Sequence, residues 1–150
     1  MTFGDNVKNK RGFSLLELLI VVAIILIIAT IAIPSLLRSR QSANETAAVA
    51  NMRNLNSAQV SYSSANGGVY GDTSNLVTAR LIDARYGTGN FSGFNFVIEL
   101  SSDFRDYTAH AFAVSANTSR YDYYSTPDFV VRYSTATSRA PAGRTGQPVQ

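Results

Sequence analysis

The chain has 150 residues, a formal net charge of +3 and no cysteine. This length suits about one domain, and the lack of cysteine excludes a disulfide framework, a thiolate metal site and a cysteine nucleophile. The arginines are scattered along the chain rather than clustered, so the charge pattern indicates no nucleic-acid partner.

The first segment, residues 1–12, is a short polar leader that carries Lys8, Lys10 and Arg11. A long apolar segment follows it directly. Because positive residues that flank a membrane helix stay on the cytoplasmic side, the leader predicts a cytoplasmic N-terminus.

The apolar run covers residues 13–33, and its only polar members are Ser14, Glu17 and Thr30. As a helix it would measure roughly 30 Å, the thickness of a bilayer core, at about 1.5 Å per residue. The Leu, Ile, Val and Phe residues of the run outweigh one buried glutamate on insertion scales. We therefore expect a transmembrane helix over residues 13–34. A cleaved secretory signal is disfavoured, because the apolar core of such a signal is only about 7–15 residues long.

The helix is expected to continue past Pro34, with a kink there. Residues 35–64 contain neither Gly nor Pro, and one stripe of them follows a helical 4-3-4-3 spacing. The spacing predicts an amphipathic helix over residues 35–66 that turns one face to a domain core. Asn66, Gly67 and Gly68 are a plausible stop. The stripe consists of Ala48, Met52, Leu55, Gln59 and Tyr62.

The remainder, residues 67–150, begins with a glycine-rich loop in which a short helical turn over 75–84, capped by Thr73 or Ser74, is possible. Apolar and polar residues then alternate over 93–100, 106–114, 119–125 and 128–134, which predicts three or four antiparallel strands. A flexible or extended C-terminal tail completes the chain. The fold class is therefore α+β: a long N-terminal helix packed on a small antiparallel sheet.

Glu17 is the residue that an ordinary membrane anchor would not need. A charge inside a membrane helix is costly, and it marks a functional site for which a partner has to be named. Cleavage between Gly12 and Phe13 would create an amine at Phe13, four residues from Glu17. Within a bundle of parallel helices this amine could pair with Glu17 of a neighbour and so fix the register between subunits. Snorkelling of Glu17 toward the interface is the alternative.

The stretch that contains Gly12, Phe13, Glu17 and Pro34 resembles the N-terminus of type IV pilins and of the pseudopilins of type II secretion systems. In that family a membrane-embedded peptidase cuts after the glycine and N-methylates the new terminal residue, here Phe13. The resemblance also implies that Glu17 supports assembly and that Pro34 ends the hydrophobic half of a long helix. Leu26 stands where many family members have glycine, which leaves Pro34 as the weak point of the helix.

Other candidate sites are weaker. His110 is the only histidine, and a packed side chain is a simpler interpretation than a catalytic one, because a triad or zinc site needs more partners. Asp103, Asp106, Asp122 and Asp128 could surround Ca²⁺, but turn formation explains them more simply. We expect no catalytic residue, no metal and no cofactor, and hence no enzyme.

The predicted function is that of a prepilin, a structural subunit that leaves the bacterial inner membrane as a single-pass precursor and joins a helical filament. Its expected partners are copies of itself, the prepilin peptidase and the inner-membrane assembly machinery. Two alternatives stay open: a pseudopilin in a periplasmic pseudopilus, and a signal-anchored membrane protein with a binding ectodomain.

Overall fold

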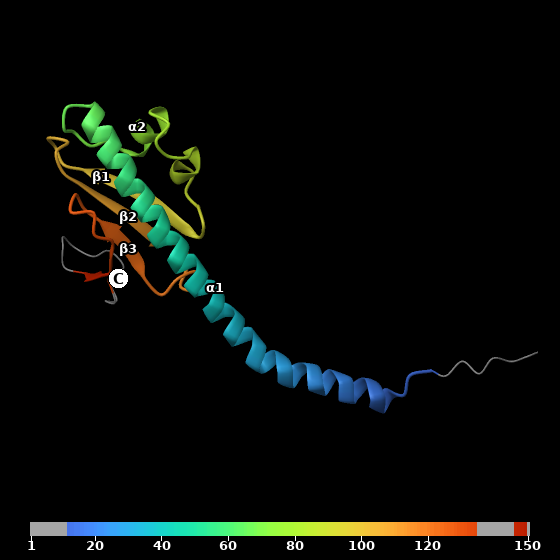
Figure 1. The fold of residues 1–150 in the computed structure, drawn as a ribbon. Coiled ribbons are helices and arrows are strands. Elements are labelled where there is room, and N and C mark those ends of the chain that lie inside the picture. The colour runs from blue at the N-terminus through green and yellow to red at the C-terminus, as the bar shows by residue number, and fades with distance from the viewer. Residues whose placement is uncertain (1–11, 135–145, 150) are drawn as a thin grey trace, which may run out of the picture. The chain divides into compact units, whose positions relative to one another are not determined.

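The computed structural model describes residues 12–134 and 146–149 (Figure 1). It divides into two compact units, Met1–Leu36 and Leu37–Gln150, and each is described by itself. The predictions for the basic leader therefore lie outside the described residues, apart from Gly12, as do those for most of the C-terminal tail.

Helix α1, Leu15–Ala65, contains 51 residues and includes Pro34 in its interior. The expectation of a long N-terminal helix that continues past Pro34 is thus confirmed. The helix ends where predicted, because Gly67 and Gly68 have φ angles of 70° and 87°, which glycine adopts at little cost. The Gly68 N–H donates to the Ser63 carbonyl at 2.9 Å, which closes the last turn.

In the second unit, α1 lies across one face of the sheet (Figure 1). The predicted stripe is the face that packs. Ala48, Met52, Leu55 and Gln59 are fully buried, and Tyr62 is partly buried against the same core. The periodicity therefore identified the buried face of the helix.

Within residues 12–134 and 146–149, the sheet has five antiparallel strands in the order β1-β2-β3-β4-β5. The predicted α+β class and its meander are confirmed, and a fifth strand is added in the tail, where no alternation signals it. The strands are β1 Phe94–Leu100, β2 Tyr107–Ala113, β3 Asp122–Ser125, β4 Arg132–Ser134 and β5 Gln147–Pro148.

Strand β1 alternates as expected. Phe94 and Phe96 are buried toward the helix, whereas Asn95 and Val97 are exposed. The register pairs Val97 with His110 of β2, so His110 lies on the sheet face opposite to α1. Since β1 is the first strand in the order, it forms one edge of the sheet.

Between α1 and β1 lie two short helices, α2 Thr73–Thr78 and the 3-10 helix η1 Ala84–Gly87. The suggested cap at Thr73 or Ser74 is wrong. Asp72 is the N-cap and accepts the Asn75 N–H at 2.7 Å, while the Asn75 side chain accepts the Asp72 N–H. The N-cap is thus one residue earlier than Thr73, and its carboxylate satisfies a backbone donor of the first turn.

Candidate functional site

The Gly12–Phe13 peptide bond lies just before α1 in chain that belongs to no helix or strand. No atom of the described residues lies within 4 Å of the position that a Cβ on Gly12 would occupy, and Phe13 is 80% exposed. The helix starts at once, because the Leu18 N–H donates to the Ser14 carbonyl at 3.2 Å. An exposed peptide bond outside regular secondary structure is one that a peptidase can reach.

Glu17 lies in the first turn of α1. A carboxylate there faces the positive end of the helix dipole, which is a favourable place for it. The side chain is exposed, and no cation in the part of the chain that the structure describes forms an ion pair with it. A cation for Glu17 therefore has to come from water, from the terminus or from another molecule.

The first unit exposes an apolar surface that a water-soluble helix would not have. Its large apolar residues from Phe13 to Leu36 are between 46% and 81% exposed. Among the described residues, α1 is the one helix long and apolar enough to cross a membrane by length and composition. Such a surface needs lipid or other apolar helices around it.

Pro34 is placed within the helix and well along α1 from Glu17. Because proline has no N–H, the carbonyl of Thr30 lacks its usual helical donor. The Thr30 hydroxyl donates to the Ile27 carbonyl at 2.7 Å. A local weak point in the hydrogen-bond ladder is therefore present, and a functional kink stays a prediction.

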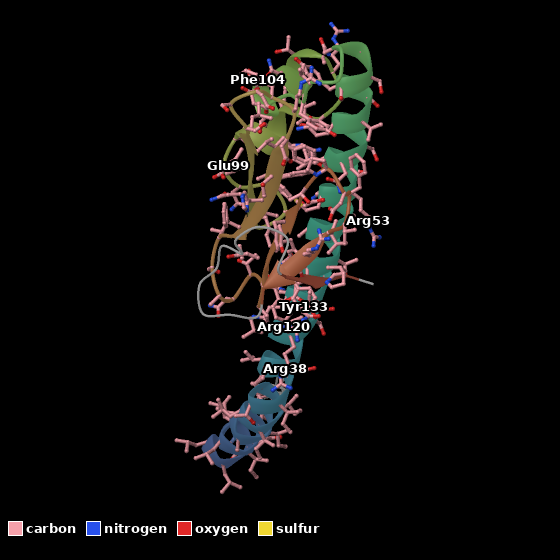
Figure 2. The ribbon with its side chains drawn as sticks, turned by 90° about the vertical axis from the view of Figure 1, so that its left-hand side faces the viewer. Arg38, Arg53, Glu99, Phe104, Arg120 and Tyr133 are labelled. Carbon is pink, nitrogen blue, oxygen red and sulfur yellow. The ribbon has the colours of Figure 1, made fainter. Side chains whose placement is uncertain are left out.

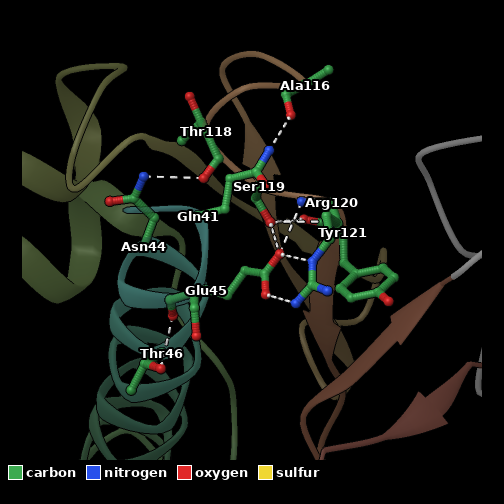
Figure 3. Close-up of polar contacts among 10 residues, drawn as sticks. Gln41, Asn44, Glu45, Thr46, Ala116, Thr118, Ser119, Arg120 and Tyr121 are labelled. Carbon is green, nitrogen blue, oxygen red and sulfur yellow. Dashed lines mark hydrogen bonds and ion pairs between the residues drawn. The ribbon is translucent and has the colours of Figure 1, made fainter. Parts of the chain in front are cut away.

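A polar network that the sequence did not suggest fastens α1 to the β2–β3 loop, residues 114–121 (Figure 3). The Glu45 carboxylate accepts the backbone N–H of Arg120 at 2.9 Å, its Nε at 3.1 Å and its Nη2 at 2.8 Å. One turn before Glu45, Gln41 donates to the Ala116 carbonyl, and Asn44, the residue directly before Glu45, donates to the Thr118 carbonyl, both at 3.0 Å.

Glu45 is nearly buried, whereas the Arg120 side chain is more than half exposed. Burial by itself raises the pKa of Glu45, but the hydrogen bonds and charge of Arg120 outweigh it and hold that pKa below the usual range. The carboxylate is therefore ionised when the network forms. The signal was available, because Gln41 and Glu45 extend the 4-3-4-3 stripe of α1 by two polar positions.

The weaker candidates do not gather into a site. His110 is buried and stacked on Phe112 with ring centroids 5.1 Å apart. Asp103 accepts the Ser101 hydroxyl, Asp122 accepts the Ala113 N–H, and Asp128 pairs with Arg132. Within residues 12–134 and 146–149, no group of three or more His, Cys, Asp or Glu could hold a metal ion.

Comparison with known proteins supports the N-terminal interpretation. Residues 7–33 match the prokaryotic N-terminal methylation motif. Over 43 residues, 29% of its length, the chain is 54% identical to the type IV wide pilus major component PilA4 of Thermus thermophilus. Over 54 residues, 36% of its length, it is 44% identical to the type IV major pilin protein PilA of Myxococcus xanthus.

The chain spans only 33% and 24% of the length of these two relatives. Both are pilus components by name, which agrees with the prediction of a structural protein rather than an enzyme. The similarity is confined to part of each chain.

Proposed function

We propose that the chain is a prepilin of the type IV pilin family, the precursor of a structural subunit of a type IV pilus-like filament, because its N-terminal part is similar to pilins. The observation that carries the proposal is the methylation motif over residues 7–33 on a helix whose apolar surface is uncovered. The second unit then supplies the head of the subunit.

Maturation removes the leader, residues 1–12, by cleavage after Gly12, and the new terminus at Phe13 is N-methylated. The open position of Gly12 and the exposure of Phe13 support this step, because a peptidase needs an accessible, unstructured bond. The partners in this step are the prepilin peptidase and the inner-membrane assembly machinery.

Assembly proceeds from a single-pass precursor in the bacterial inner membrane with its N-terminus in the cytoplasm. The apolar helices of residues 13–34 bundle in the filament core, and Glu17 pairs with the Phe13 amine of a neighbouring copy. This pair offsets the cost of a carboxylate in an apolar environment. Pro34 lets the helix bend as it packs.

A pilus is favoured over a pseudopilus because both relatives are named as major pilus components. A pseudopilin of a type II secretion system would share the same N-terminal chemistry. The location of the mature protein distinguishes the two.

The test is the intact mass and N-terminal sequence of the protein from native membranes and from filaments sheared off the cell surface. We expect a chain that begins at Phe13, carries one extra methyl group and is abundant in the sheared fraction. The same processed chain confined to the periplasm would replace the pilus with a pseudopilus. A chain that retains the leader in both fractions would contradict the proposal.

A Gly12→Val variant tests the junction itself. We expect the precursor to accumulate in the membrane with its leader attached, because a side chain at this position would obstruct the peptidase. Gly4→Val, a glycine-to-valine change elsewhere in the leader, is the matched control and should be processed normally. Normal processing of Gly12→Val would contradict the assigned cleavage site.

A further inference from the structure

An apolar groove with one cation beside it lies between α1 and the segment that joins β3 to β4 in the second unit. We call Arg53, Val60 and Phe129 the helix-side patch. Together with Asn56 and Ser57 these residues line an open groove of about 310 Å³. Val60 is 45% exposed and Phe129 is 43% exposed. Arg53 forms no ion pair with any residue that the structure describes.

Phe129 is held at this groove by its backbone rather than by packing of its ring. Its φ angle is 61°, a left-handed conformation that is rare for a bulky residue and costs about 1–3 kcal/mol. Two hydrogen bonds keep it there. Its N–H donates to the Thr126 carbonyl at 2.8 Å, and its carbonyl accepts Nδ2 of the buried Asn56 at 3.2 Å. A strained backbone that presents an aromatic ring to solvent points to a contact surface.

A second patch lies at the edge of the sheet on β1. We call Val97 and Glu99 the edge patch. Val97 is 40% exposed, and the Glu99 side chain is 69% exposed. Among the described residues, the one basic side chain within 4 Å of the Glu99 carboxylate is His110, whose Nε2 lies 3.8 Å from Oε2 of Glu99. Burial lowers the pKa of His110 despite the opposing effect of Glu99, so the ring is neutral at pH 7 and leaves Glu99 without a cation.

The backbone at this edge is also open. The Val114 N–H donates to the Gly93 carbonyl and the Ser101 N–H to the Asp106 carbonyl, so the odd-numbered residues of β1 bond to β2. In an antiparallel ladder the even-numbered residues, such as Phe96 and Ile98, then direct their N–H and C=O groups away from β2. No other described strand pairs with them. Such an edge readily pairs with another molecule.

The two patches are complementary in chemistry and lie on opposite sides of the second unit. Figure 2 shows Arg53 beside the helix and Glu99 on the far side of the sheet. One patch combines an apolar groove with a cation, and the other combines an apolar side chain with an anion. When two different patches on opposite sides of a subunit fit each other, copies associate head to tail. Such a contact propagates as an open filament instead of closing into a dimer.

We infer that the edge patch of one subunit docks on the helix-side patch of a second copy of this chain, with Val97 in the groove between Val60 and Phe129 and Glu99 paired with Arg53. The inference rests on the proposed filament and names a contact between the heads within it.

Disulfide trapping tests the contact without background, because the chain has no cysteine. The variant carries Ser57→Cys in the groove together with Val97→Cys at the edge. Mild oxidation of sheared filaments should convert this double variant into a ladder of covalent multimers, since each subunit offers both halves of the contact. Ser57→Cys alone and Val97→Cys alone are the controls and should stay monomeric. Dimers from either single variant would show a self-contact and overturn the inference.

A charge exchange gives an independent test. Arg53→Glu and Glu99→Arg should each lower the yield of sheared filaments roughly tenfold, because like charges then face each other across the contact. The double exchange should restore the yield. Arg80→Glu, the same charge change at an exposed arginine outside both patches, should leave it unchanged.

The results separate this inference from the proposed function. If the unaltered chain forms no filaments and keeps its leader, the proposed function fails. If it forms filaments but the double cysteine variant gives no ladder and the double exchange does not restore the yield, the head contact alone is wrong.

Discussion

Glu45 is the residue through which α1 holds the β2–β3 loop. Its carboxylate accepts three hydrogen bonds from Arg120, from both the backbone and the guanidinium. A bidentate arginine pair of this kind is directional as well as strong. The ionised Glu45 carboxylate therefore holds the loop in the folded chain, whereas it is hydrated in the unfolded chain. The contribution of the Glu45–Arg120 pair to stability depends on Glu45 being ionised.

We predict that Glu45→Gln lowers the free energy of unfolding by about 2 kcal/mol, because hydrogen bonds to charged groups are worth roughly 1.5–3 kcal/mol. Chemical denaturation of the full chain in detergent micelles measures it. Glu99→Gln is the matched control, since this carboxylate is exposed, and it should change stability by no more than about 0.5 kcal/mol. Equal losses in both variants would contradict the assigned role of Glu45.

The same pair makes stability depend on pH. The pKa of Glu45 is lower in the folded chain than the ordinary value of 4.5, so the unfolded chain binds a proton more readily on acidification. The contribution is therefore complete above the unfolded value and is lost as the pH falls through the folded value. In Glu45→Gln this part of the acid dependence should be absent.

At the scale of elements, the segments with a repeating pattern could be predicted, short strands β3 and β4 included, and the features without such a pattern could not. The α1 stripe and the alternation in β1 repeat often enough that burial of one face is the only consistent interpretation. The Asp72 cap and strand β5 depend instead on single contacts. Gln147 and Pro148 of β5 pair with Tyr133 and Arg132 of β4. No local sequence pattern predicts this pairing.

The candidate site divides in the same way. Gly12, Phe13, Glu17 and Pro34 stand out because their chemistry conflicts with an otherwise apolar or helical segment. The Glu45–Arg120 pair does not, because its members are 75 residues apart in sequence. Only the fold brings a helix glutamate beside a loop arginine, so the sequence could show no more than an unusual polar position on a buried stripe.

The loop between α1 and β1 is fastened by Gln59, a fully buried amide. Its Nε2 donates to the Gly71 carbonyl at 2.6 Å, and its Oε1 accepts the Gly71 N–H at 3.1 Å. Space for a larger residue at Gly71 is tight, because an added Cβ would lie 3.0 Å from both the Tyr62 ring and the Asn75 Cβ. The Gln59 amide thus forms with Gly71 the pair of hydrogen bonds that a neighbouring strand would form with the backbone.

We predict that Gln59→Leu lowers the free energy of unfolding by roughly 3 kcal/mol, since it leaves two buried backbone groups unpaired at about 1–3 kcal/mol each. The loop should also become the first site of limited proteolysis in the full chain. Ser61→Ala removes one exposed helix-surface hydrogen bond and is the control. Unchanged stability in Gln59→Leu would mean that water replaces the amide.

At the scale of the whole molecule, the two units call for different surroundings. The second unit buries its own core, whereas the first leaves its large apolar side chains uncovered. An apolar helix satisfies this need equally well in lipid and in a bundle of like helices. The transfer from membrane to filament therefore leaves the apolar surface covered throughout, and the feature that distinguishes the two states has to be polar.

Glu17 is that polar feature, and its removal should separate insertion from assembly. In Glu17→Ala, insertion should be at least as favourable, because the cost of a charge within the apolar segment is gone. The variant should therefore reach the membrane and lose its leader, as mass spectrometry of the membrane fraction would show. Filament yield in the sheared fraction should nevertheless fall sharply, because no carboxylate remains for the Phe13 amine of a neighbour. Ser14→Ala, a polar-to-alanine change one turn earlier, is the control. A normal filament yield from Glu17→Ala would mean that apolar packing alone sets the register.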